Sequence, residues 1–140
     1  MTVRVDLTPP DKRMATPAQR SAVTAVPDGL IVAERPWGSF KQLVKNTEVT
    51  VKIITVQPGH RLSLQRHARR EEVWHILDHP MQIEVEDRVW VAQVGEQVRV
   101  RVGARHRLGN AGAQPARVLE IAFGDFDEDD IERLADDYSR

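Results

Sequence analysis

The 140-residue sequence predicts one all-β domain, a sandwich or a barrel, from two observations. First, short runs of Val, Ile and Leu alternate with polar residues between Leu30 and Phe123, most strictly in the segment 98–102. Second, turn signals such as Pro58-Gly59 and Gly95-Glu96 separate these runs. Because no helical periods alternate with the strand-like runs, the pattern does not favour an α/β fold.

The first 29 residues differ from the rest of the chain. This segment, 1–29, contains four prolines and shows no sustained period of 2 or 3.6, so we expect an N-terminal arm that does not fold alone. The domain proper is expected over 30–140. The candidate strands in it are 40–45, 49–56, 62–67, 73–78, 82–86, 89–93, 97–102 and 117–123.

The C-terminal segment 127–138 has the one helical pattern in the sequence. Asp127 is a candidate N-cap, and the acidic residues that follow it suit the positive end of a helix dipole. An apolar stripe at helical spacing follows, made of Ile131, Leu134, Ala135 and Tyr138. We therefore expect a short C-terminal helix that packs against the barrel.

Composition excludes several classes of function. The chain has 20 basic and 21 acidic residues, a net charge of −1, which argues against a nucleic-acid-binding protein. It has no cysteine, so disulfides, thiolate metal sites and cysteine nucleophiles are excluded. No apolar run is long enough to span a membrane and no signal peptide is recognisable, so we expect a cytoplasmic protein.

Four residues form a candidate metal site. Gln65 and His67 lie at i and i+2, on one face of a strand, and Glu72 follows after a short basic turn. His106 lies far downstream, just after a strand and Gly103. A barrel can bring all four together, and amide, imidazole and carboxylate ligands suit a divalent first-row metal. The alternative is that these histidines are ordinary core or surface residues.

The motifs around these residues resemble those of the cupin family. Gly59, Gln65, His67 and Glu72 follow its first motif, with Gln in place of the first His. Gly95, Gly103, His106 and Asn110 follow its second motif. More narrowly, residues 34–140 resemble the cupin domain of type II mannose-6-phosphate isomerases, which also forms the C-terminal part of bifunctional enzymes with mannose-1-phosphate guanylyltransferase. The matching stretches include 34–40, 61–67, 70–74, 103–110 and 128–138.

The resemblance implies a fold, a reaction and a ligand set. The fold is the double-stranded β-helix, a jelly-roll barrel, and the reaction is the interconversion of mannose 6-phosphate and fructose 6-phosphate in GDP-mannose and polysaccharide biosynthesis. One divalent ion, zinc first and Mn, Co, Fe, Ni or Mg as alternatives, would be held by Gln65, His67, Glu72 and His106.

Basic residues complete the implied site. Arg70 and Lys52 are the candidate catalytic residues, and Arg61 and Arg70 are the candidates for binding the sugar phosphate. No residue is recognisable as the general base. A homodimer that covers an open sheet edge is expected, with the arm as a candidate contact across the partner.

The sequence also departs from the family pattern around the site. Arg69 replaces a second His of the family pattern, Val73 replaces the His that precedes Trp74, and His79 and Arg101 replace a Gly and a Pro. These departures leave two alternatives open. One is a non-catalytic cupin that binds metal or sugar, and the other is a different cupin enzyme that acts on a related sugar phosphate.

Overall fold

The computed structural model describes residues 31–138. All regular secondary structure assigned in that range is β-strand. This confirms the all-β class. In chain order the strands are β1 (Ile31–Arg35), β2 (Gly38–Gln42), β3 (Val49–Val56), β4 (Leu64–Arg66), β5 (Arg70–Ile76), β6 (Met81–Val85), β7 (Arg88–Ala92), β8 (Gln97–Val100), β9 (His106–Gly109), β10 (Ala116–Gly124) and β11 (Glu132–Ala135).

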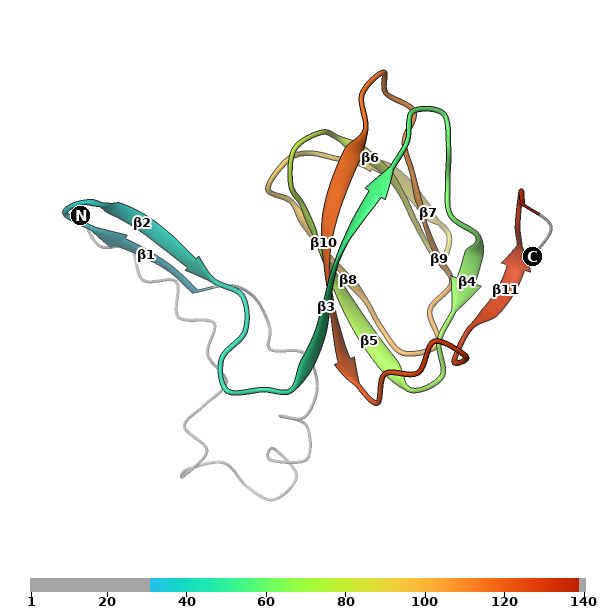
Figure 1. The fold of residues 1–140 in the computed structure, drawn as a ribbon, viewed down its shortest axis with the longest axis horizontal. Helices are drawn as coiled ribbons and strands as arrows, with labels where there is room; N and C mark the ends of the chain where they lie inside the picture. Colours follow the sequence, from blue (N-terminus) through green and yellow to red (C-terminus); the bar gives the residue numbers. More distant parts are fainter. Residues whose placement is uncertain (1–30, 139–140) are drawn as a thin grey trace. The chain divides into compact units, whose positions relative to one another are not determined.

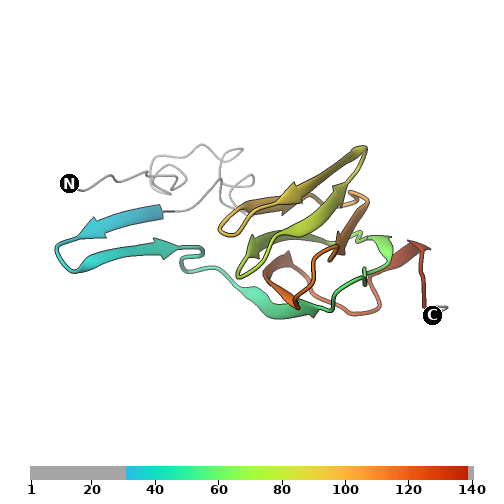
Figure 2. The same cartoon turned by 90° about the horizontal axis from the view of Figure 1, so that it is seen from above.

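Two antiparallel sheets face each other in the unit that begins at Val49 (Figures 1 and 2). One has the strand order β3-β10-β5-β8 and the other β11-β4-β9-β6-β7. Neighbouring strands come from distant parts of the sequence, as where β10 pairs with both β3 and β5. This double-sheet arrangement is the predicted jelly roll.

Strands β1 and β2 form a hairpin of their own in the preceding unit, which ends at Glu48. The guanidinium of Arg35 lies over the Phe40 ring, 5.2 Å from its centroid, and helps to hold the two strands together. The arm expected at 1–29 lies outside the described residues.

The interior changes from apolar to polar along the strands. Inward residues at one end, such as Val56, Ile76 and Val118, belong to the hydrophobic core. Further along the same strands the inward positions become Lys52, Glu72 and Glu120, as side-chain alternation requires. Apolar packing at one end of the barrel therefore supports a polar interior at the other end.

The predicted C-terminal helix at 127–138 is wrong. Asp127 makes a turn, since its side chain accepts a hydrogen bond from the Asp129 amide, 2.9 Å, and the following residues form β11. Pairing of Glu132 with Arg66 and of Arg133 with Gln65 draws this segment into the sheet. Leu134 and Tyr138 are exposed, so the apolar stripe covers no core. Tertiary pairing thus overrides the helical pattern.

The other strand predictions differ mainly at their ends. The sequence pattern missed β1, β9 and β11, and His106 is the first residue of β9. One close approach requires glycine. Gly124 has φ +106°, and a Cβ there would lie 2.7 Å from the Arg69 carbonyl oxygen.

In residues 31–138 we find no helix that is long and apolar enough to cross a membrane.

Candidate metal centre

Pairing between strands brings the predicted ligands to one place. Gln65 on β4 lies directly opposite His106 on β9, so both side chains point to the same side of the sheet. His67 lies two residues after Gln65. Glu72 comes from β5 in the facing sheet, where it is 1% exposed.

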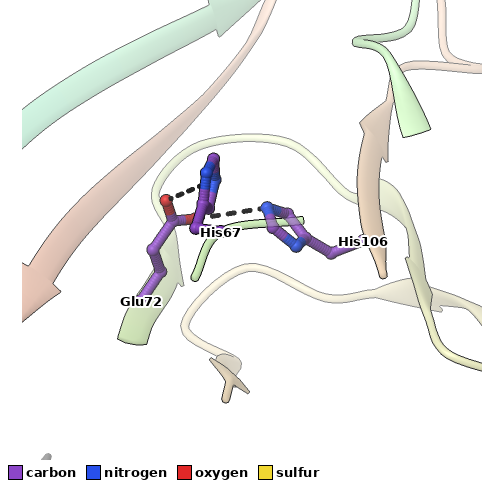
Figure 3. Close-up of side chains that lie close together, drawn as sticks. All are labelled: His67, Glu72 and His106. Atoms are coloured by element: carbon purple, nitrogen blue, oxygen red, sulfur yellow. Dashed lines mark ion pairs between the residues drawn. The ribbon is translucent and has the colours of Figure 1, made fainter. Parts of the chain in front are cut away.

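His67, Glu72 and His106 form a buried cluster (Figure 3). One ligand atom from each residue lies within 4.8 Å of the others. His67 Nε2 is 3.2 Å from Glu72 Oε1, and His106 Nε2 is 3.6 Å from Glu72 Oε2. Both imidazoles therefore direct Nε2 at the same carboxylate.

The donor atoms of this cluster fit a metal ion. The Nδ1 of His67 donates to the Asp130 carbonyl, 2.6 Å, and the Nδ1 of His106 donates to the Ala104 carbonyl, 2.8 Å. Such bonds fix the tautomer and leave a lone pair on Nε2, which in His67 accepts a hydrogen bond from Arg70 Nη2, 3.4 Å. The buried His106 Nε2 has no hydrogen-bond partner, and burial lowers the pKa of His106, which favours the neutral form that binds metal.

Glu72 is held as a carboxylate. Burial opposes its ionisation, but the close polar contacts with His67, His106 and Arg70 lower its pKa to about 2. Trp74 Nε1 also donates to Glu72 Oε2, 3.2 Å. The cluster thus combines two imidazoles with one carboxylate, a common divalent-metal ligand set.

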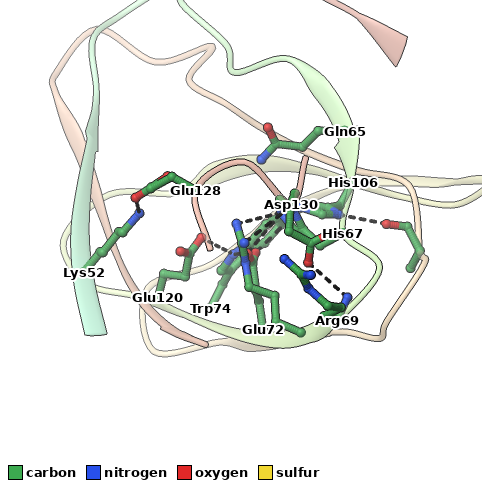
Figure 4. Close-up of polar contacts among 12 residues, drawn as sticks. Lys52, Gln65, His67, Arg69, Glu72, Trp74, His106, Glu120, Glu128 and Asp130 are labelled. Carbon is green, nitrogen blue, oxygen red and sulfur yellow. Dashed lines mark hydrogen bonds and ion pairs between the residues drawn. The ribbon is translucent and has the colours of Figure 1, made fainter. Parts of the chain in front are cut away.

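The candidate catalytic residues Arg70 and Lys52 both line the cavity beside the cluster, and Figure 4 shows Lys52 there with Glu128 and Glu120. Arg70 is buried, with Nε 3.2 Å from Glu72 Oε1 and Nη1 2.9 Å from the Asp127 carbonyl. Lys52 is half-exposed and pairs with Glu128 at 2.5 Å. Both cations also lie over the Phe126 ring.

Gln65 and Arg61 have different surroundings. Gln65 lines the cavity of the cluster, and its Oε1 accepts a hydrogen bond from Ser63, 2.9 Å. Arg61 lines another cavity and makes a two-point contact with Asp137, 2.7 and 3.1 Å. The structure therefore brings Gln65, but not Arg61, to the clustered donors.

Sequence reasoning missed Glu120, which lies on β10 between Lys52 and Trp74 in the cross-strand register. It is 6% exposed and accepts a hydrogen bond from Trp74 Nε1, 3.3 Å. Burial and the nearby Glu72 carboxylate raise the pKa of Glu120 to about 7. The signal was present, because strand alternation puts this acid on the face of Val118 and Ala122.

Asp130 was also missed, because it was assigned to a helix. Its carboxylate accepts hydrogen bonds from the amides of Ala68 and Arg69, 2.9 and 3.0 Å, while its carbonyl accepts the bond from His67. Asp130 thus holds in place both the turn before β5 and the imidazole of His67. No sequence signal distinguishes it from its acidic neighbours.

Two departures from the family pattern do not remove a donor from the cluster. The Arg69 side chain is half-exposed and pairs with Asp125 and Asp127. Val73 is buried, but strand alternation places it on the opposite face from Glu72 and Trp74.

A cavity of about 180 Å³ adjoins the cluster. Its lining includes Lys52, Gln65, Arg70 and Glu120, together with two of the clustered donors, His67 and Glu72. A metal held by three protein groups keeps open positions for oxygens of a bound molecule. The arrangement can therefore bind a small polar molecule with an anionic group and move a proton within it.

The family model described as mannose-6-phosphate isomerase C-terminal matches residues 30–136. The chain is 38% identical to the alginate biosynthesis protein AlgA of Pseudomonas aeruginosa over 107 residues, 76% of this chain and 22% of AlgA. It is 34% identical to a mannose-1-phosphate guanylyltransferase of Sinorhizobium fredii over 127 residues, 90% of this chain and 24% of that protein. The chain spans about a quarter or less of these curated relatives.

Solved structures agree on the fold. A cupin 2 domain-containing protein from Halorhodospira halophila has a TM-score of 0.56 at 23% identity, covering 64% of this chain and 60% of that one. The capsular polysaccharide assembling protein CapF from Staphylococcus aureus has a TM-score of 0.56 at 19% identity, covering 76% and 33%. These likenesses support the cupin fold.

Proposed function

Because the chain belongs to the mannose-6-phosphate isomerase C-terminal family, we propose that it is a metal-dependent isomerase of mannose 6-phosphate and fructose 6-phosphate. The observation that carries this proposal is the convergence of His67, Glu72 and His106 beside a polar cavity. Relatives named for alginate and xanthan biosynthesis suggest that the reaction serves polysaccharide formation.

In this proposal the cluster residues hold a metal ion, and two backbone carbonyls orient the histidines. A divalent ion held by His67, Glu72 and His106, with Gln65 as a neutral fourth ligand, would polarise the sugar oxygens and stabilise developing negative charge. We propose zinc as this ion. Asp130 and Ala104 keep the two imidazoles in the required tautomer through their carbonyl groups.

The isomerisation moves protons without net oxidation. The C2–H bond of the aldose breaks, a C1–H bond forms, and the hydroxyl proton passes from O2 to O1. Glu120 and Glu128 both line the cavity outside the donor cluster, and Glu128 is paired with Lys52. In this proposal Glu120 carries the proton between the two carbons. Arg70 and Lys52 provide positive charge beside the reacting oxygens.

A coupled assay with mannose 6-phosphate tests the proposal. The protein is stripped with a chelator, reloaded with zinc, manganese or cobalt, and its metal content measured before each assay. We expect turnover only in loaded protein, and none in Glu72→Gln. Fully loaded protein that does not convert mannose 6-phosphate would favour a non-catalytic cupin.

The homodimer expected from the sequence is also a proposal. It is supported by β3, an edge strand on which Val51 and Ile53 are exposed. Light scattering measures the mass, and a value near the single-chain 15.9 kDa would contradict the dimer.

A further inference from the structure

Three basic side chains line the cavity beside the metal centre, and they differ in their partners. Lys52 is paired with Glu128, and Arg70 is held by Glu72 and the Asp127 carbonyl. Arg133 is the third. Within residues 31–138, no acidic side chain lies within ion-pair distance of Arg133. Its guanidinium is therefore available for an anion that enters the cavity.

The register of β11 directs Arg133 toward the cavity. Arg133 lies opposite Gln65, and Gln65 lies opposite His106. Paired residues point to the same side of a sheet, so these three side chains form a row across β11, β4 and β9. The neighbouring Glu132 points the other way and pairs with Arg66, 2.7 Å.

The row also determines the distance between Arg133 and His106. Adjacent strands lie about 4.8 Å apart, so Arg133 and His106 are separated by roughly 10 Å. An open-chain hexose phosphate can span this distance, with its reacting carbons at the cluster and its phosphate at Arg133. The exposed position of Arg133 suits the end of the substrate that undergoes no chemistry.

We propose that Arg133 binds the phosphate group of the substrate at the cavity mouth. This inference rests on the proposed isomerase function and names the residue that selects phosphorylated sugars. Arginine suits the role because its planar guanidinium binds phosphate through two hydrogen bonds. Arg61, the residue expected for this role from sequence, already makes that two-point contact with Asp137.

Calorimetry on the zinc-loaded full chain tests the proposal with mannose 6-phosphate and inorganic phosphate as probes. We expect Arg133→Gln to weaken binding of both probes at least tenfold without changing the zinc content. Arg133→Lys should give an intermediate loss, because it keeps the charge but not the two-point contact. The matched control is Arg66→Gln, which removes the same charge from the outer face of β4 and should change binding less than twofold.

The outcomes separate this inference from the proposed function. Phosphate binding that depends on Arg133 without any isomerisation would support the inference and contradict the isomerase. Turnover with an Arg133→Gln KM equal to that of the wild type would support the isomerase and overturn the inference. Equal losses in Arg133→Gln and Arg66→Gln, or no phosphate binding by the wild type, would also overturn it.

Discussion

Two of the cavities in the described part of the Val49–Arg140 unit contain both histidine and arginine, and Leu62 lines both. The larger, about 320 Å³, contains His60, Arg61 and Tyr138. The smaller, about 180 Å³, adjoins the cluster of His67, Glu72 and His106. Cavity size alone would favour the larger cavity as the functional site.

The two cavities differ in the hydrogen-bond partners of their polar side chains. In the larger one the polar groups satisfy each other, since His60 Nδ1 lies 2.8 Å from the Tyr138 hydroxyl and Arg61 is paired with Asp137. In the smaller one backbone carbonyls hold each Nδ1 and leave the Nε2 atoms facing one carboxylate. Buried ligand atoms that converge on one carboxylate, with His106 Nε2 lacking a hydrogen-bond partner, therefore indicate a site better than cavity volume does.

The largest expected effect comes from removing one histidine of the cluster. His67→Ala should weaken zinc binding at least 100-fold, because it deletes a ligand and leaves Glu72 with fewer partners. His60→Ala is the matched control and should change zinc affinity less than twofold. Competition with a chromogenic chelator measures both affinities, and circular dichroism shows that each variant is folded. Equal effects of the two substitutions would remove the distinction between the cavities.

The next effect concerns the stability of the metal-free protein. Glu120 has a pKa raised to about 7, from 4.5, so its contribution to stability is fully present below pH 4.5 and is lost as the pH rises through 7. Glu120→Gln removes this loss. The variant should gain roughly 1–3 kcal/mol over wild type between pH 5 and pH 8.

Urea unfolding in the presence of a chelator measures this gain. The relevant quantity is the difference in unfolding free energy between Glu120→Gln and wild type at each pH. A difference that stays constant from pH 5 to pH 8 would mean that the pKa of Glu120 is not raised in the folded protein.

The smallest effect is expected in the larger cavity. Arg61→Gln removes an exposed ion pair with Asp137, and such pairs contribute little to stability. We expect a small change in melting temperature that disappears in high salt, and unchanged zinc content. If Arg61→Gln lowered zinc affinity as strongly as His67→Ala, the two cavities would have to be treated as one site.

Much of the barrel could be predicted because strand alternation is a local property. The core side of β5, β8 and β10 follows directly from alternating residues, and three proposed ligands lie where their motif positions put them in a jelly roll. The position of Gln65 opposite His106 required the register between two distant strands, which no local pattern contains.

The C-terminal segment shows why prediction failed elsewhere. Its capping residue and apolar spacing satisfy the rules for an amphipathic helix, but its acids have partners far away in sequence. Glu132 pairs with Arg66, and Asp130 binds the amides of Ala68 and Arg69. Because these contacts are non-local, the roles of Asp130 and Arg133 could not be inferred from sequence.

The register between β11 and β4 determines whether a positive or a negative side chain faces the cavity mouth. Successive strand residues point to opposite faces, so a slip of one position would turn Glu132 inward and Arg133 outward. One inserted or deleted residue between Asp127 and Glu132 would thus exchange an anion-attracting entrance for a repelling one, with composition almost unchanged. In relatives, the length of this short segment should therefore vary less than the identity of its residues.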